Sequence, residues 1–329
     1  MIQVATNWLA WLTNGRWLNH VNLNAQELER YARHITLSQV GVEGQERLKA
    51  AKVLCIGSGG LGSPVAMYLA AAGVGQLGLV DADTVDRSNL HRQLLHGESD
   101  IGTKKLKSAE RTLREINPHV NLELHDVFFQ ASNAMEIADG YDLIVDGTDN
   151  FPTRYLSNDV AHFLKIPNVY GSIYQFEGQV SVFASHQGGP CYRCLFPTPP
   201  KPGLVPSCAA GGVFGVLPGL VGSLQATEAI KWMLGLGESL AGRLLHVDTL
   251  SMRVRTFNLR RDPKCPLCGE KPEITELIDY EAFCGIPKTA ESKVPEVTPE
   301  ELAVLLEEEP ETFVLVDVRE DFERAICRI

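Results

Sequence analysis

Apolar and polar residues alternate in blocks along the first half of the chain. Short runs of continuous apolar residues, typical of strands buried on both faces, are separated by longer stretches with helical periodicity. The expected strands are residues 52–56, 76–81, 120–126 and 141–147, and the expected helices are residues 64–72, 104–116 and 154–164. This order predicts a doubly wound α/β fold around a mostly parallel sheet.

The pattern changes after Asn168. Residues 179–184, 244–248 and 253–259 predict further strands, with alternating side chains that favour an antiparallel continuation of the sheet. Residues 208–227 carry no charge and are long enough to span a bilayer. Five glycines and one proline interrupt this run, so we expect a buried turn and helix instead.

The pattern also predicts the division into domains. Residues 1–15 are uncharged and lack the basic start and cleavage site of a signal peptide, so residues 1–22 are expected to form a loose or weakly helical extension. We expect the α/β domain over residues 23–271, a polar linker over 272–294 and the start of a second domain over 295–329. Thr298 and Pro299 predict a helix start, followed by a strand from Phe313. One helix and one strand cannot bury a core, so this second domain is expected to be incomplete.

Composition narrows the class of protein. The 329 residues are 44% hydrophobic and 22% charged, as in ordinary globular proteins. The formal net charge of −11 provides no global positive field for nucleic acid or an anionic membrane, so neither partner is expected. Eight cysteines are too sparse for a secreted disulfide scaffold, which favours a cytoplasmic protein with bound metal.

A glycine-rich turn follows the first expected strand. Gly57, Gly59 and Gly62 lie between that strand and a helix, where backbone N–H groups and the helix dipole bind phosphate. Asp81 ends the next strand, where a carboxylate accepts ribose hydroxyls. These residues fit NAD as well as ATP. The dipeptide Gly-Lys does not occur, which excludes the Walker phosphate loop.

Any ATP site therefore needs cations from elsewhere. Asn89 and Arg92 in SNLHRQ, and Lys104 and Lys105 in GTKK, are candidates, although a single Arg or Lys is more commonly a solvated surface residue. Asp146 and Asp149 follow another strand at the edge where α/β sheets bind ligands, and carboxylates there suit Mg²⁺.

Four of the cysteines form two C-x-x-C pairs. Cys191 with Cys194, and Cys265 with Cys268, provide the four thiolates of a tetrahedral structural zinc site that joins two distant segments. A redox C-x-x-C is the alternative. Cys208, in VPSCAAGG, is either a loop nucleophile or a small buried side chain.

Several motifs together resemble one family, the bacterial ubiquitin-activating-like adenylyltransferases, especially its members in molybdopterin and thiamine biosynthesis. The motifs cover about residues 25–270 and are RYARHI (30–35), GSGGLG (57–62), LVDADTV (79–85), SNLHRQ (88–93), GTKK (102–105), DGTDN (146–150), CYRC, VPSCAAGGV and CPLC. The resemblance implies a Rossmann-like fold and a homodimer. It also implies that ATP adenylylates the C-terminal glycine of a small ubiquitin-like sulfur carrier ending in Gly-Gly, which becomes a thiocarboxylate.

The resemblance also assigns roles to residues. ATP would bind at Gly60 in the glycine turn, and Asp149 would contact Mg²⁺ or the nucleotide. Cys208 would be the loop cysteine that some relatives use covalently, and Arg33 would reach the neighbouring subunit's phosphates. The remaining nucleotide-binding residues implied are Asp81, Ser88, Asn89, Arg92, Lys105 and Asn150.

The C-terminal segment resembles the start of a rhodanese domain. Its segments VTPEELAVLLEEE and FVLVDVRE match, but Cys327 does not match the persulfide-carrying loop and receives no role. The sulfur donor is therefore expected to be another protein, such as a cysteine desulfurase or a rhodanese. The alternatives to adenylylation are an NAD-dependent oxidoreductase, which leaves Arg92, Lys105 and Asp149 unexplained, and a non-catalytic scaffold that binds the carrier.

Overall fold

The structure is a computed structural model that describes residues 21–201, 211–286, 297–308, 313–317 and 324. The chain divides into two units, with the boundary between Ile286 and Pro287. Cys208, Cys327 and the extension of residues 1–20 lie outside the described residues.

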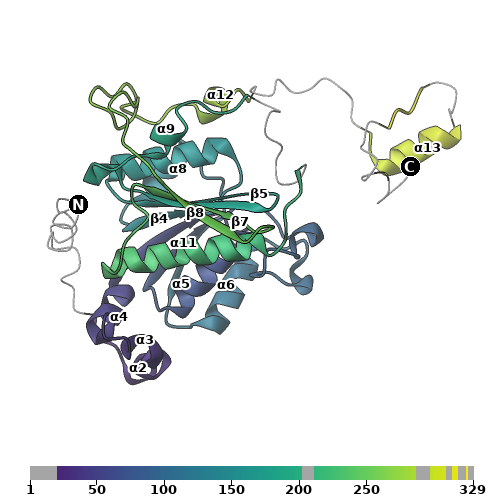
Figure 1. Cartoon of the computed structure of the whole chain (residues 1–329). Coiled ribbons are helices and arrows are strands. Elements are labelled where there is room, and N and C mark those ends of the chain that lie inside the picture. Colours follow the sequence, from purple (N-terminus) through teal and green to yellow (C-terminus); the bar gives the residue numbers. More distant parts are fainter. Residues whose placement is uncertain (1–20, 202–210, 287–296, 309–312, 318–323, 325–329) are drawn as a thin grey trace. The chain divides into compact units, whose positions relative to one another are not determined.

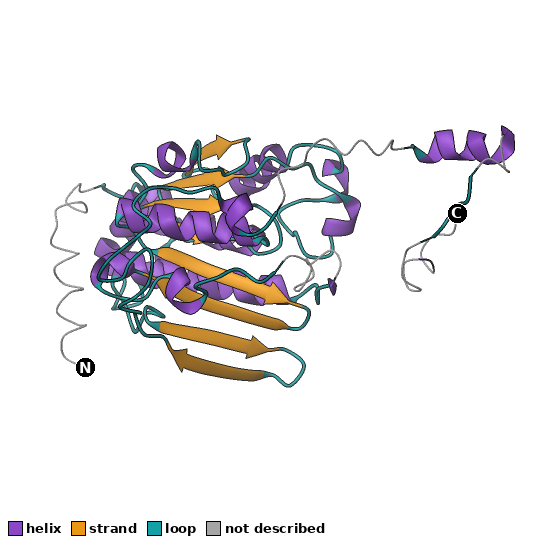
Figure 2. Cartoon of the chain, turned by 90° about the horizontal axis from the view of Figure 1, so that it is seen from above, coloured by secondary structure: helices purple, strands orange, loops and turns teal. Residues whose placement is uncertain are grey.

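An eight-stranded sheet forms the centre of the first unit, with strand order β3-β2-β1-β4-β5-β6-β7-β8. The strands are β1 (Lys52–Ile56), β2 (Gln76–Val80), β3 (Asn121–His125), β4 (Leu143–Asp146), β5 (Asn168–Tyr174), β6 (Glu177–Phe183), β7 (Arg243–Asp248) and β8 (Arg253–Asn258). They lie side by side across the unit (Figure 2). The pairs from β3 to β5 are parallel, and those from β5 to β8 are antiparallel. The predicted parallel sheet with an antiparallel continuation is confirmed.

Helices cover both faces of this sheet, as Figure 1 shows. One face packs against α4 (Gly41–Ala50), α5 (Gly62–Ala71), α6 (Lys105–Ile116) and α11 (Leu217–Leu234). The other packs against α7 (Ala134–Ala138), α8 (Phe151–Leu164), α9 (Tyr192–Leu195) and α12 (Tyr280–Phe283). The described part of this unit also contains α2 (Ala25–Arg30), α3 (Ala32–Ile35), η1 (Arg87–Asn89), η2 (Glu98–Asp100) and η3 (Ser185–Gln187).

The uncharged run ends in a buried helix, as expected. Its second half forms the start of α11, which packs against α5 and strands β5 and β6 and buries Trp232 in the core. None of the helices in the described ranges is both long and apolar enough to cross a membrane.

The predicted linker 272–294 contains a packed helix. Tyr280 and Cys284 are buried against α8, with Phe283 packed beside them. Because these apolar side chains stand among polar neighbours, the average polarity of the segment concealed a short helix. The first unit accordingly runs to Ile286.

The second unit contains α13 (Pro299–Glu308). The Thr298 hydroxyl accepts a hydrogen bond from the Glu301 N–H at 3.2 Å, and the Glu301 carboxylate accepts one from the Thr298 N–H at 2.8 Å. This reciprocal cap confirms the predicted helix start. The strand predicted from Phe313 is wrong for residues 313–317, which pair with no strand of the described chain. A run of apolar residues forms a strand only beside another strand that completes its hydrogen bonds.

Candidate active site

The carboxyl ends of β1, β2 and β4 meet at one edge of the sheet. Ile56 is in register with Val80 on one side and with Asp146 on the other. From β1 the chain adds β2 and β3 on one side of the sheet and then β4 on the other side. The topological switch point between β1 and β4 is where open α/β sheets usually bind ligands. A pocket opens here, and its lining includes Gly57, Gly59, Gly60, Asp81, Arg92, Lys105, Asp149 and Asn150. We call it the edge pocket.

The glycine turn between β1 and α5 requires glycine at two positions. Gly57 has φ +87°, a conformation that side chains disfavour. A Cβ at Gly62 would lie 1.9 Å from the Gly57 carbonyl oxygen. The turn can therefore be this tight only with glycine at both positions. Leu61, just before α5, supplies no side-chain cap, so the start of the helix remains suited to an anion.

Asp81 and Lys105 form the charged wall of the edge pocket. The Asp81 carboxylate accepts hydrogen bonds from the Ser58 N–H and hydroxyl, both at 2.8 Å. The Lys105 ammonium lies 2.8 Å from an Asp83 oxygen and 3.9 Å from an Asp81 oxygen. Lys105 is buried, so its charge is poorly screened by water and acts strongly on an anion in the pocket.

The loop after β2 presents Arg92 to the pocket. The Arg92 guanidinium donates to the Asn89 side-chain oxygen at 2.8 Å and to the Ser88 carbonyl at 3.1 Å. Ser88 and Asn89 do not line the pocket in the described structure and contact Arg92 instead.

The two aspartates at the carboxyl end of β4 have different environments. Asp149 is exposed and lines the pocket, beside Asn150, whose side chain caps α8 through the Thr153 N–H at 2.9 Å. Asp146 is fully buried and accepts hydrogen bonds from Thr148 and Ser157. Burial raises the pKa of Asp146, although these hydrogen bonds oppose the shift. The interpretation of Asp146 as a Mg²⁺ ligand is therefore wrong, whereas Asp149 is accessible to a cation.

Other predicted site residues lie away from the pocket lining. Gly62 begins α5 directly behind the turn, and Arg33 lies in α3 without lining the pocket as described. Sequence reasoning missed an apolar part of the lining. Val127, Phe128 and Phe129 follow β3, and Phe128 is 65% exposed. The adjacent aromatic residues Phe128 and Phe129, directly after a predicted strand, could have indicated this apolar part of the pocket.

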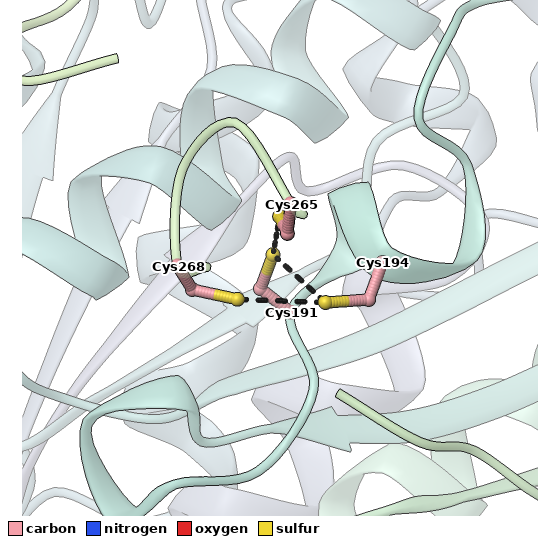
Figure 3. A group of neighbouring side chains, drawn as sticks. All are labelled: Cys191, Cys194, Cys265 and Cys268. Carbon is pink, nitrogen blue, oxygen red and sulfur yellow. Dashed lines mark hydrogen bonds between the residues drawn. The ribbon is translucent and has the colours of Figure 1, made fainter. Parts of the chain in front are cut away.

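The four cysteines of the C-x-x-C pairs meet in one cluster (Figure 3), with all sulfur atoms within 4.8 Å of one another. The measured Sγ–Sγ distances are 3.9 Å for Cys191–Cys194, 3.6 Å for Cys191–Cys265 and 3.4 Å for Cys194–Cys268. A tetrahedron with Zn–S bonds of about 2.3 Å has edges of about 3.8 Å. The cluster therefore has the size of a tetrahedral zinc site.

Comparison with protein families agrees with this geometry. The model of the ThiF family matches residues 31–267, which include the edge pocket and three of the four clustered cysteines. The chain belongs to the ThiF family. The ThiF match includes all eight strands of the sheet and the glycine turn.

Curated ThiF relatives match much of the chain. The sulfur carrier protein adenylyltransferase of Thermus thermophilus is 56% identical, with 79% of this chain and 98% of the relative covered. The probable adenylyltransferase/sulfurtransferase MoeZ of Mycobacterium tuberculosis is 49% identical, with 93% and 78% covered. Among solved structures, E. coli MccB has a TM-score of 0.66 at 22% identity, with 81% of this chain and 80% of MccB covered, which shows the shared fold.

Proposed function

We propose that this protein uses ATP to adenylylate the C-terminal glycine carboxylate of a small ubiquitin-like sulfur carrier ending in Gly-Gly. The observation that carries the proposal is the edge pocket of a ThiF chain, which gathers a glycine turn, two cations and two exposed polar groups around one space. Relatives named sulfur carrier protein adenylyltransferase and MoeZ support the same reaction. An NAD-dependent oxidoreductase would leave these cations without a role, and a non-catalytic scaffold would not need them.

The reaction needs positioning and charge more than it needs a side-chain nucleophile. A carrier carboxylate oxygen attacks the α-phosphorus of ATP, the bond from this phosphorus to the bridging oxygen breaks, and pyrophosphate leaves. The backbone of the glycine turn and the start of α5 would bind phosphate, and Asp81 would accept the ribose hydroxyls. Arg92 and Lys105 would stabilise the charge that develops on the phosphates.

Magnesium would assist at the same edge. Asp149, which is exposed to the pocket, would hold the ion with Asn150 beside it, and Mg²⁺ would neutralise phosphate charge. Ser88 and Asn89 would act through Arg92, whose guanidinium they contact. Zinc would occupy the four-cysteine cluster and stabilise the fold, since that cluster is not part of the edge pocket.

The proposal includes partners. An apolar groove beside Arg92, lined by Tyr68, Leu94 and Val216, is suited to contact with a second copy, and Arg33 would then reach the phosphates of that copy. A separate desulfurase or rhodanese would supply sulfur to the acyl-adenylate. Cys208 keeps its proposed role as a covalent sulfur or carrier site.

Exchange between ATP and labelled pyrophosphate tests the proposal. Purified zinc-loaded protein is mixed with candidate carriers ending in Gly-Gly, and with the same carriers lacking the last glycine. Exchange that requires the intact carrier supports acyl-adenylation and identifies the preferred carrier. If folded, zinc-loaded protein catalyses no ATP–pyrophosphate exchange in the presence of any of the carriers, the proposal is contradicted.

A further inference from the structure

The Arg92 guanidinium is held by three acceptors from its own loop. Besides Ser88 and Asn89, its Nη1 lies 2.7 Å from the Nε2 of His91. The contact with His91 is the shortest of the three. The His91 side chain therefore helps to set the direction in which Arg92 points. His91 itself is not among the described residues that line the edge pocket.

The chemistry of the pair determines the state of His91. A guanidinium has only donors, so the imidazole Nε2 must be the acceptor. His91 is then neutral and carries its proton on Nδ1. The His91 side chain is exposed, but its partial desolvation, followed by the charge of Arg92, lowers the pKa of His91, in agreement with this state.

Among the described residues, Arg92 is the charged group that shifts the pKa of His91. Gly215 lies against His91 and adds no titratable side chain. A Cβ at Gly215 would lie 2.8 Å from the His91 Nδ1 and 3.0 Å from its carbonyl oxygen. On its own loop, Arg87 pairs with Glu98 at 2.6 Å. Arg92 is therefore the charge that His91 faces.

We propose that His91 is a positioning residue that holds Arg92 toward the bound phosphates through its neutral Nε2. The inference rests on the proposed adenylylation. When His91 takes up a proton, it loses the acceptor and places a second positive charge against the guanidinium. Arg92 is then released from one of its three contacts, and adenylylation declines on the acidic side.

Two replacements of His91 distinguish the effect of its hydrogen-bond acceptor from the effect of its protonation. Carrier-dependent ATP–pyrophosphate exchange is measured from about pH 5 to about pH 8.5, a range that extends below the ordinary histidine pKa because the pKa of His91 is lowered. His91→Ala should lower kcat/KM for ATP by about tenfold at pH 8, as expected for one lost hydrogen bond to a charged group. His91→Gln retains an acceptor that does not titrate, so it should keep activity at pH 8 within about threefold and lose the acidic decline.

A double-mutant cycle distinguishes positioning from general structural support. In an Arg92→Ala background, His91→Ala should cause no further loss, because its partner is gone. His119→Gln, in the turn before β3 at the opposite edge of the sheet, is the control and should match wild type. Unchanged activity of His91→Ala, an acidic decline that persists in His91→Gln, or additive losses in the cycle would each overturn the inference. Wild type without exchange would instead contradict the proposed function.

Discussion

The Arg193 guanidinium forms a bidentate ion pair with the Asp159 carboxylate, with N–O distances of 2.9 and 2.7 Å, and both side chains are fully buried. Arg193 stands between two clustered cysteines in α9, and Asp159 belongs to α8. The Tyr280 hydroxyl of α12 donates to the same carboxylate at 2.9 Å. One buried carboxylate therefore joins the cysteine cluster, α8 and the helix that precedes the second unit.

Asp159→Asn should be strongly destabilising. It leaves the Arg193 charge buried without a counterion, which costs about 3–5 kcal/mol of unfolding free energy. Urea unfolding of the zinc-loaded protein measures this loss. Glu43→Gln removes the exposed partner of Arg47 and is the control, with an expected cost below about 1 kcal/mol. Equal unfolding free energies of the two variants would show that the buried ion pair does not stabilise the fold.

Metal removal should destabilise the first unit. Zinc binds cysteine thiolates, and the four cysteine sulfur atoms lie within 4.8 Å of one another. Elemental analysis should find one zinc per chain, and chelation should lower the melting temperature. Cys268→Ala should lose the metal, whereas Cys284→Ala removes a buried cysteine outside the cluster and should retain it. Zinc-free protein with an unchanged melting curve would contradict the zinc assignment.

The sequence predicts the elements whose patterns are local and long. Apolar runs specify β1, β2 and β4, and the glycines specify the turn before α5, because period and backbone conformation depend on few neighbours. The two C-x-x-C pairs reveal ligands 74 residues apart, since each pair is a recognisable chelate.

Other features depend on contacts that no local pattern contains. Asp146 ends β4 and Asp149 follows it, and the contacts of Thr148 and Ser157 with Asp146 separate a buried acceptor from an exposed carboxylate. The buried pair of Asp159 and Arg193 is likewise invisible in sequence, because charged residues on helices are ordinarily solvated.

Lys105 and Lys104 are adjacent but should differ in effect. Lys105 is buried at the pocket, whereas the Lys104 side chain is half exposed and bonds to the Ala82 carbonyl and Asp126. Lys105→Ala should lower carrier-dependent exchange by about 10²–10³-fold, as for loss of one preorganised charge-stabilising donor. Lys104→Ala should remain within about twofold, since exposed ion pairs contribute little. Comparable losses of exchange in the two variants would contradict the assignment of Lys105 to the phosphate site. Thermal melting shows whether both variants fold.

The free energy of unfolding should decrease at acidic pH, in part because His96 becomes protonated. Its Nε2 donates to the Ser58 carbonyl at 3.2 Å and its Nδ1 accepts from the Ser108 hydroxyl at 3.0 Å, so the folded state holds it neutral. Burial lowers the pKa of His96. The unfolded chain therefore binds the proton first, and the stabilisation is present above about pH 6.5 and lost as pH falls through the folded pKa. Urea unfolding between pH 8 and pH 5 should show a flatter pH dependence for His96→Gln. Parallel curves would contradict this assignment.

The glycine turn allows folding and nucleotide binding to be separated. A Cβ at Gly62 would lie 1.9 Å from the backbone oxygen of Gly57, so Gly62→Ala must displace the turn and should lower stability and exchange together. At Gly59 the nearest atom is the Gln93 side-chain nitrogen at 3.5 Å, an ordinary contact. Gly59→Ala should therefore fold normally and raise the KM for ATP by about tenfold or more, because displacing phosphate by less than about 1 Å is costly.

Gly219→Ala is the matched stability control for both variants. Gly219 lies in α11 with nothing within 4 Å of an added Cβ, so this variant should match wild type or gain about 0.5–1 kcal/mol. Melting curves and the ATP dependence of exchange measure the three variants. Wild-type stability of Gly62→Ala would contradict the tight turn, and wild-type KM for Gly59→Ala would show that phosphate does not approach Gly59. Loss of stability in Gly62→Ala with normal folding of Gly59→Ala would instead show that glycines three positions apart in one motif serve different physical purposes, one for backbone packing and one for ligand access.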